Sequence, residues 1–349
     1  MIVVPCQPGK LSLGIRAPPA KVLSGIWRGR RPGTTRGLAV VGFARQSRVM
    51  LRDTLHLHLD PPQLAQVAEG RFPLVDRIRA ALAPLNIALD IRPDSLDERR
   101  RAPQRPGWSL FHLHEPEGPR GLTLRRAYFF PFWRIERTNA RWNFAVVGQQ
   151  FDPAAVDPQA AARFRDRLRR RICGDLRGSR GGYIYMPLQG RLLEHRSFQA
   201  TSPVEMIKAV LAVDGRDIRA TLHPKESYSA AEHQALAALA ARHPRFRLVT
   251  SDPGLLADCD LVVTQNSSVA MTGFLLDKSA LLFAQIDFHH IAASVPRHGL
   301  DAAFAQLSGP PPDFAAYLWW FFQVTCIDAM AATAEERILG QLRAGGWPH

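Results

Sequence analysis

The sequence predicts an α/β protein with two Rossmann-like domains facing a cleft, followed by a C-terminal helix. Two observations carry this prediction. Between residues 183 and 288, short apolar runs alternate regularly with helix-forming segments, which is typical of a parallel sheet covered by helices on both faces. The length of 349 residues exceeds one ordinary α/β core and suits two domains.

Composition and pattern divide the chain into four segments. They are a basic leader (residues 1–50), an N-terminal α/β domain (51–173), a second α/β domain (183–300) and C-terminal helices (313–345). The leader is rich in Gly, Pro and Arg without periodicity, which predicts disorder. We expect it to be either dispensable or an upstream extension of a chain that starts near Met50. The glycine-rich run 174–182 is the predicted linker between the two α/β domains.

The expected elements follow this division. In the N-terminal domain, apolar patterning predicts strands at 54–59 and 109–114 and helices at 73–82 and 158–172, with a mobile Arg- and Pro-rich loop at 92–106. In the second domain, strands are expected at 183–188, 218–222, 246–250, 261–264 and 280–283, and helices at 203–211, 230–242, 253–257 and 269–276. Ser202-Pro203-Val204-Glu205 has the pattern of a capping box with Pro at the first helical position.

The C-terminal segment 314–332 is dense in aromatic residues and follows three prolines and Asp313, a pattern that predicts a helix with Asp313 as its N-cap. No run of ~18 uncharged apolar residues exists, so we predict no transmembrane helix. Two interpretations of this helix stay open. It is buried in the protein, or its aromatic residues dock on a membrane surface.

The net charge of +14 lies mostly in the leader, which holds nine basic residues and no acidic one. No zinc-finger, RRM or basic-zipper pattern is present, so we expect no nucleic-acid partner. A basic surface that faces a membrane or an anionic glycan stays open. Cys6, Cys173, Cys259 and Cys326 form no C-x-x-C pair, which favours reduced thiols in a cytoplasmic protein.

Two polar turns are the most informative motifs. Leu222-His223-Pro224-Lys225 and Thr264-Gln265-Asn266-Ser267-Ser268 each follow a predicted strand and precede a helical segment. Turns of this kind lie at the carboxyl edge of a sheet, where an α/β protein binds anions. A His and a Ser-Ser pair on two such turns predict a phosphate held from two sides, as in a nucleotide-sugar enzyme. Each motif alone is equally explained as an ordinary helix cap.

Within the first turn, Pro224 restricts the conformation of His223 and so aims its imidazole, which can donate to a phosphate oxygen. Lys225 adds a positive charge. A third segment leaves the first strand of this domain through Gln189 and reaches Glu194. A carboxylate there can act as base or nucleophile at a sugar carbon, or belong to a solvated loop.

Three further groups are candidates for binding. Asp258-Cys259-Asp260 resembles a D-x-D metal motif, but we interpret it as structural. The alternating histidines in 56–60 and 112–115 suit an exposed or cleft-facing strand, where one of them can contact an acceptor, better than they suit a metal site. The aromatic and Arg-rich stretch 125–136 offers Arg125, Arg126 and Trp133 as acceptor-binding residues, since Arg binds carboxylates and aromatic faces stack on sugars. A core strand is the alternative.

Taken in order, the runs 183–189, Ser202-Pro203, 222–225 and 258–269 resemble the capsule polysaccharide biosynthesis family, which includes β-Kdo transferases that use CMP-Kdo. The His-Pro and Ser-Ser elements are also similar to those of bacterial sialyltransferases, which use CMP-sialic acid. The resemblance covers residues 183 to 290 and implies a GT-B architecture with the donor in the second domain. One departure is that Met271-Thr272-Gly273 stands where the family commonly carries Glu-Ala.

The resemblance implies that His223 contacts the CMP phosphate and helps it leave, that Ser267 and Ser268 complete the phosphate and ribose site, and that Gln189 lies at the sugar end. Glu194 corresponds most nearly to the catalytic carboxylate, although the family usually has an Asp at slightly different spacing. The predicted site residues are catalytic Glu194 and His223, donor-binding Gln189, Pro224, Lys225, Asn266, Ser267 and Ser268, and acceptor-binding Arg125, Arg126 and Trp133.

The sequence therefore predicts a metal-independent glycosyltransferase without a cofactor, cytoplasmic or peripheral on the inner membrane. Its partners would be a CMP-activated acidic sugar such as Kdo, a polysaccharide or glycolipid acceptor, and membrane-associated assembly machinery. Two alternatives stay open. One is a non-catalytic capsule polysaccharide export or assembly protein, and the other is a transferase that uses a UDP- or GDP-sugar.

Overall fold

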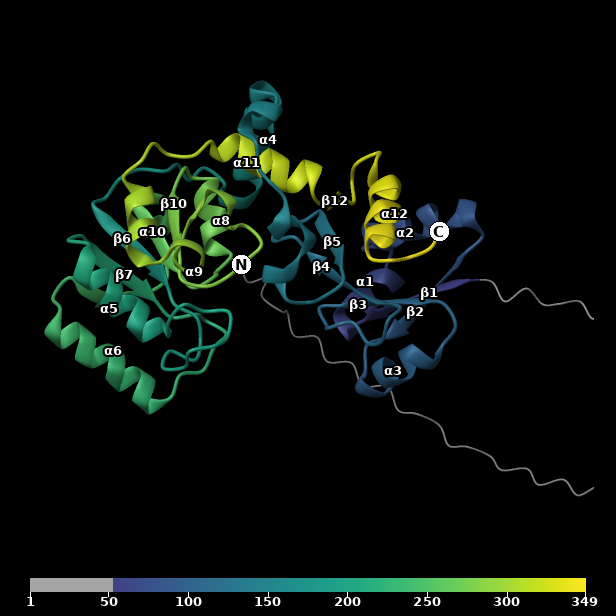
Figure 1. The fold of residues 1–349 in the computed structure, drawn as a ribbon, viewed down its shortest axis with the longest axis horizontal. Coiled ribbons are helices and arrows are strands. Elements are labelled where there is room, and N and C mark those ends of the chain that lie inside the picture. The colour runs from purple at the N-terminus through teal and green to yellow at the C-terminus, as the bar shows by residue number, and fades with distance from the viewer. Residues whose placement is uncertain (1–52) are drawn as a thin grey trace, which may run out of the picture. The chain divides into compact units, whose positions relative to one another are not determined.

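A computed structural model describes residues 53–349, which contain two six-stranded α/β sheets and C-terminal helices (Figure 1). The predicted fold class, two Rossmann-like sheets of the GT-B kind with a C-terminal helix, is confirmed. The leader predicted at 1–50 lies outside the described residues. Between residues 174 and 182, the predicted linker, no helix or strand is present.

The first sheet has the strand order β12-β5-β4-β3-β1-β2. Its strands are β1 (Thr54–Leu59), β2 (Ala88–Pro93), β3 (Trp108–His112), β4 (Gly121–Arg126), β5 (Phe132–Glu136) and β12 (Ile327–Asp328). Strands β1 to β4 run parallel, whereas β5 is antiparallel to β4, and β12 is antiparallel to β5. The helices around it are α1 (Pro61–Ala68), α2 (Pro73–Leu82), α3 (Leu96–Arg101) and α12 (Ala334–Ala344).

Alternation along β1 gives the first sheet two different faces. Leu55, Leu57 and Leu59 are fully buried in a core shared with α2 and α12. His56 and His58 point to the opposite face. There His56 bonds to Asp90 (2.9 Å) and to the Pro106 carbonyl (3.0 Å), while His58 stacks on the ring of Phe111.

The stretch 92–106 covers this histidine face, and the prediction that it is a mobile loop is wrong. It folds into α3 and a 3₁₀ turn, Ala102–Gln104. Ser95 caps α3 by accepting from the Glu98 backbone N–H, and the Glu98 carboxylate pairs with Arg92 (3.3 Å) and Arg105 (2.7 Å). These ion pairs fold an apparently solvated, charged stretch onto the sheet.

The second sheet is entirely parallel and has the order β11-β10-β9-β6-β7-β8. Its strands are β6 (Tyr183–Pro187), β7 (Asp217–Thr221), β8 (Phe246–Leu248), β9 (Leu261–Thr264), β10 (Ser279–Leu282) and β11 (Ala293–Ser294). Numbered along the sheet this is 3-2-1-4-5-6, the doubly wound order of dinucleotide-binding proteins.

Helices cover both faces of the second sheet. They are α5 (Pro203–Val213), α6 (Ala230–Arg242), α7 (Pro253–Asp258), α8 (Val269–Phe274), α9 (Val295–His298) and α10 (Leu300–Leu307), with α4 (Pro158–Cys173) and α11 (Phe314–Trp319) packed nearby. Ile184 and Met186 of β6 pack with α5, α6 and α10, whereas Tyr183 and Tyr185 pack with α7 and α8. The continuous apolar strands are therefore buried on both sides, as the sequence predicts.

Side-chain caps begin several helices. Ser202 accepts from the Glu205 backbone N–H (3.2 Å), so the predicted cap of α5 is present. The reciprocal half of the predicted capping box is absent, because the Glu205 carboxylate pairs with Lys208 instead (2.8 Å). A complete box forms at α6, between Ser229 and Glu232.

The C-terminal segment is not the single helix expected over 314–332. It consists of α11, a π-helical turn (Trp320–Val324) and then β12, which pairs with β5. After the π-helical turn, the Thr325 carbonyl accepts from the Arg134 guanidinium (3.1 Å). The aromatic residues Phe314, Tyr317, Trp320, Phe321 and Phe322 are buried, which favours the interpretation as a buried helix over membrane docking. In the part of the chain that the structure describes, no helix is long and apolar enough to cross a membrane.

A buried charge cluster lies in the core between the two sheets. Asp287, which is fully buried in the connection from β10 to β11, accepts from the Tyr128 hydroxyl and from Arg141 (3.4 Å). The Arg141 guanidinium also lies over the Tyr128 ring (4.4 Å) and donates to the Arg126 carbonyl (2.7 Å). Burial works against the charged guanidinium, but Tyr128 and Asp287 outweigh it and raise the pKa of Arg141.

Acid should weaken the first sheet through His58. Burial lowers the pKa of His58 from 6.5 to about 4. The unfolded chain therefore takes up this proton at a higher pH, so the stability that the neutral side chain provides is full above pH 6.5 and is lost as the pH falls toward 4. The loss is about 1.4 kcal/mol per pH unit. Urea unfolding at pH 7.5 and 5.0 should show that His58→Leu loses about 2 kcal/mol less than the wild type over this interval.

The control is His233→Leu, which removes an exposed histidine of α6 and should keep the pH dependence of the wild type. An identical pH dependence in His58→Leu and the wild type would contradict the prediction.

Removing the charge of Asp287 should destabilise the protein strongly. Asp287→Asn leaves the buried Arg141 without its counter-ion, and breaking a buried pair in this way costs about 3–5 kcal/mol. Asp277→Asn is the matched control, because Asp277 is exposed and pairs with Arg165 at the surface (2.7 Å), where such a pair contributes about 0–1 kcal/mol. Urea unfolding of both variants measures the difference. Equal midpoints would show that the Asp287 cluster adds no more than a surface pair.

Candidate functional site

The topology of the second sheet defines where its site lies. Strand order reverses between β6 and β9, and ligands of doubly wound sheets bind outside the carboxyl ends of the strands at such a switch point. Residues that leave β6 begin with Leu188 and Gln189, and those that leave β9 begin with Gln265 and Asn266. The predicted donor residues that follow β6 and β9 therefore lie at the switch point.

A direct contact joins the segment that leaves β6 to the segment that leaves β9. The backbone N–H of Asn266 donates to Gln189 Oε1 (3.3 Å), and two residues earlier on each segment the Thr264 hydroxyl donates to the Pro187 carbonyl (3.1 Å). The Asn266 amide donates onward to the Gln285 carbonyl (3.3 Å) after β10. Polar groups from three neighbouring strand ends are thus connected at one edge of the sheet.

The His-Pro turn lies beside this contact. The Leu188 N–H donates to the Thr221 carbonyl at the end of β7 (2.8 Å). A Cβ placed on Gly190 would lie only 2.3 Å from the Glu226 carboxylate. Because Gly190 has no side chain, the turn after β7 can approach the segment after β6 closely at this position.

His223 is held in a defined orientation and tautomer. The His223 backbone N–H donates to the Tyr228 hydroxyl (2.8 Å), and the Lys225 backbone N–H donates to His223 Nδ1 (3.2 Å). Because Nδ1 accepts, the neutral ring carries its proton on Nε2. No described residue pairs with Nε2, which leaves this N–H free to donate to a ligand. Pro224 and Lys225 are exposed next to it.

The Ser-Ser pair is half-buried at the start of α8. Ser267 Oγ accepts from the Val269 N–H (3.3 Å), so Ser267 acts as a local cap. Ser268 is the N-cap residue by position, yet its side chain makes no capping bond. The alternative of an ordinary cap thus explains Ser267 in part, while the Ser268 hydroxyl has no acceptor or donor partner among the described residues.

Glu194 is placed differently from the other predicted residues. It is exposed in the loop between β6 and α5, and its carboxylate pairs with Arg191 (3.2 Å), which is exposed as well. No hydrogen bond or ion pair within the described residues connects Glu194 to His223 or Gln189. Its catalytic role stays a prediction that the local geometry does not strengthen.

The three predicted acceptor residues lie at the carboxyl end of β4, with Arg125 and Arg126 on that strand and Trp133 opposite Arg126 on β5. Arg125 donates to the Asn139 carbonyl and side chain (both 2.9 Å), and burial lowers its pKa to about 10. The Arg126 guanidinium lies over Trp133 (5.3 Å). Trp133 is only 2% exposed and belongs to the core. We therefore retain Arg125 and Arg126 as acceptor candidates and assign Trp133 a packing role.

The other polar motifs have structural partners. Asp258 accepts from the Ser179 hydroxyl (2.7 Å) and Asp260 from the Gly182 N–H (3.1 Å), so this pair fixes the linker. His112 pairs with Asp60 (3.1 Å) at the carboxyl ends of β3 and β1. No group of three or more His, Cys, Asp or Glu residues within 53–349 is arranged to hold a metal ion.

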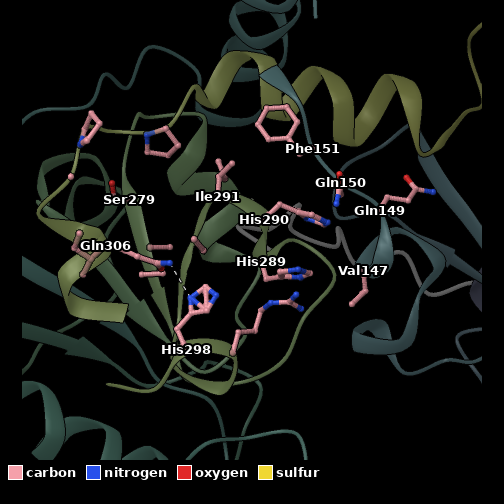
Figure 2. Close-up of a pocket in the computed structure, with 18 of the residues that line it drawn as sticks. Val147, Gln149, Gln150, Phe151, Ser279, His289, His290, Ile291, His298 and Gln306 are labelled. Carbon is pink, nitrogen blue, oxygen red and sulfur yellow. Dashed lines mark hydrogen bonds between the residues drawn. The ribbon is translucent and has the colours of Figure 1, made fainter. Parts of the chain in front are cut away.

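A cavity of about 670 Å³ lies apart from the switch point. Ser279 and Ala293, at the amino ends of β10 and β11, contribute to its wall. Figure 2 shows His289 and His290 next to each other in it, and their rings stack 4.2 Å apart. Burial lowers the pKa of His290 to about 4. The cavity contains none of the residues predicted from the sequence, so the switch point remains the candidate site.

Two contacts of Phe198, in the loop between β6 and α5, were not predicted from the sequence. Trp142 stacks on Phe198 (4.6 Å between ring centroids), and Phe198 in turn lies under the Arg196 guanidinium (4.8 Å). The aromatic and Arg-rich composition was visible, but nothing in the spacing indicated that residues more than fifty positions apart would stack.

No family model matches the chain, and no curated protein sequence matches it. Among solved structures, it is similar to the β-Kdo 2,7 transferase of Thermosulfurimonas dismutans KpsC, at 12% identity and a TM-score of 0.45 over 84% of this chain and 99% of that chain. The β-Kdo 2,4 transferase of the same KpsC has 12% identity and a TM-score of 0.42 over 75% and 89%. UDP-GlcNAc 2-epimerase from Neisseria meningitidis, bound to UDP-GlcNAc, has 9% identity and a TM-score of 0.34 over 84% and 100%.

The orientation of His223 gives a prediction that NMR can check. In protein labelled with ¹⁵N-histidine, the His223 ring should occupy the Nε2–H tautomer at pH 8, because the Lys225 N–H holds Nδ1 as an acceptor. The exposed His233 serves as the comparison within the same spectrum. A mixture of tautomers at His223, or a proton on Nδ1, would show that the turn does not preset the ring.

Proposed function

We propose that the chain is a metal-independent glycosyltransferase of surface polysaccharide synthesis that takes a CMP-activated acidic sugar such as Kdo. The observation that carries the proposal is the contact between Gln189 and Asn266 (3.3 Å) at the switch point of a 3-2-1-4-5-6 sheet. The proposal is supported by the topology of the second sheet, because the segments that carry Gln189, His223 and Asn266 follow neighbouring strands and leave the sheet at its carboxyl edge.

In this proposal His223 is the group that helps the nucleotide leave. Its Nε2–H donates to a phosphate oxygen and offsets the negative charge that develops on CMP as the sugar–oxygen bond breaks. Lys225 adds positive charge beside it, with Pro224 shaping the turn. Ser268 and Ser267 bind the phosphate and ribose, and Gln189 lies toward the sugar. These donors replace the divalent cation that a diphosphate would need.

The acceptor is a polysaccharide or glycolipid that binds at Arg125 and Arg126, whose guanidinium groups suit carboxylates or phosphates of a growing glycan. Glu194 is the carboxylate assigned to the sugar carbon. We place the protein in the cytoplasm or at the inner face of the membrane, with the machinery that assembles the polysaccharide as its partner.

A non-catalytic export or assembly protein is the second candidate function. Two observations favour it: Glu194 is exposed and paired with Arg191 (3.2 Å), and Met271-Thr272-Gly273 replaces the Glu-Ala pair of the resembling family. A transferase that uses a UDP- or GDP-sugar is the third, because the proposed phosphate contacts do not read the base.

Calorimetric titration with CMP, UDP and GDP separates these functions. The proposal expects CMP to bind in preference to the other two, and Ser267→Ala to weaken CMP binding about tenfold, the effect of one hydrogen bond to a charged group. Ser308→Ala, an exposed serine after α10, is the control and should bind CMP like the wild type. With a CMP-sugar donor, His223→Ala should lower turnover by about 10²-fold or more.

The outcomes are distinct. Preference for UDP or GDP would replace the donor while keeping the reaction class. Absence of binding to all three nucleotides would favour the export or assembly protein. Wild-type turnover in His223→Ala would remove His223 from the mechanism.

A further inference from the structure

The loop between β6 and α5, residues 188–202, is anchored across the ends of neighbouring strands. The Ala200 N–H donates to the Phe283 carbonyl (2.7 Å), and the Gln285 N–H donates to the Phe198 carbonyl (2.8 Å). Both partners lie directly after β10. Because these bonds fix the second half of the loop to the sheet, its side chains have defined positions at the carboxyl edge.

Two buried donors in this loop lack an acceptor. Arg196 Nε and Gln199 Nε2 are both inaccessible to solvent, and neither has a hydrogen-bond partner among the described residues. Gln199 is only 6% exposed. Its Oε1 accepts from the Arg196 backbone N–H (2.8 Å), which holds the side-chain amide next to Arg196. Buried polar groups are nearly always paired, so two unpaired N–H donors in one loop indicate a missing acceptor.

The Arg196 side chain is also held from behind. Its guanidinium lies over the ring of Phe198 (4.8 Å), which stacks on Trp142 (4.6 Å, with 20° between the ring planes). A guanidinium that is stacked in this way loses little further conformational freedom when it binds. The stack therefore orients a cation before any ligand arrives.

No carboxylate neutralises Arg196. Among the described residues, none comes within 4.0 Å of its guanidinium. The acidic groups that act on it are Glu194, which pairs with Arg191, and Glu226, which lies against Gly190. Burial, followed by the charge of Arg191, lowers the pKa of Arg196. An unpaired cation in such surroundings is stabilised when an anion binds.

We propose that Arg196 and Gln199 form an oxyanion-binding site, which takes a phosphate or a carboxylate group. Both side chains offer only donors at the unpaired atoms, and the planar guanidinium suits two oxygens of either group. The site continues from the switch point, since Gln285 both accepts from the Asn266 amide and donates to the Phe198 carbonyl. That the oxyanion belongs to a sugar nucleotide rests on the proposed function.

Three variants test the site. Arg196→Gln removes the charge, and Gln199→Glu keeps the acceptor for the Arg196 backbone N–H while replacing the amide donor by an anion. Arg167→Gln, which removes an exposed arginine of α4, is the charge-matched control. The probes are inorganic phosphate, CMP, cytidine and CMP-N-acetylneuraminate, titrated by calorimetry. Circular dichroism and the urea midpoint check that each variant folds.

We expect Arg196→Gln and Gln199→Glu to weaken binding of at least one anionic probe tenfold or more, with Arg167→Gln within twofold of the wild type. If the oxyanion is the nucleotide phosphate, CMP and inorganic phosphate weaken while cytidine is unchanged. If it is the sugar carboxylate, CMP is unchanged and only CMP-N-acetylneuraminate weakens. Unchanged binding of every anionic probe by both folded variants would overturn the site and indicate that water satisfies the two donors.

These outcomes are separable from those of the proposed function. Anion binding that depends on Arg196 without any preference among CMP, UDP and GDP would support the oxyanion site and count against the CMP-sugar transferase. Selective CMP binding that survives both variants would support the CMP-sugar transferase and count against the oxyanion site. Should Gln199→Glu fail to fold, Arg196→Gln and Arg196→Lys decide the question, because Lys keeps the charge but not the planar pair of donors.

Discussion

The buried carboxylate of Asp287 is the group that links the end of β4, with Arg125 and Arg126, to the carboxyl edge of the second sheet. A charge with no exposed surface must be paired, and here the partners are the Tyr128 hydroxyl and the Arg141 guanidinium. Tyr128 follows β4, whose last two residues are Arg125 and Arg126, and Arg141, which follows β5, donates to the Arg126 carbonyl (2.7 Å). Asp287 follows β10. One ion cluster therefore ties the acceptor candidates of the first sheet to the segment after β10, where the Gln285 carbonyl accepts from the Asn266 amide (3.3 Å).

Within the second sheet, topology does most of the work of building a site. Strand order reverses between β6 and β9, and the residues that leave these strands are polar and bonded to each other at Gln189 and Asn266. The loop with Arg196 and Gln199 then crosses toward β10. The edge thus collects hydrogen-bond donors, namely the His223 imidazole, a serine hydroxyl, an amide and a guanidinium, which is the chemistry expected of a surface for an anionic ligand.

Sequence reasoning worked where a signal is local. The short apolar runs of the second sheet and the cap at Ser202 depend on neighbours a few residues away, and the structure has them close to the expected positions. It failed where distant residues decide. The stretch 92–106 folds over a histidine face, where Glu98 pairs with Arg105. The C-terminal segment leaves its helical path where Arg134 donates to the Thr325 carbonyl and β12 pairs with β5. Stacking of Trp142 on Phe198 is likewise invisible to periodicity.

The return of the C-terminus to the first sheet has a consequence for how the protein is made. Strand β12 and helix α12 supply the sheet edge and part of the core around Leu55, yet they come after every strand of the second sheet along the chain. The first sheet therefore remains incomplete until β12 has been synthesised, whereas the second sheet can fold from contiguous sequence. During synthesis the order of folding is reversed relative to the order of emergence, and a nascent chain that stalls before residue 327 exposes the unpaired edge of β5 to whatever strand it meets.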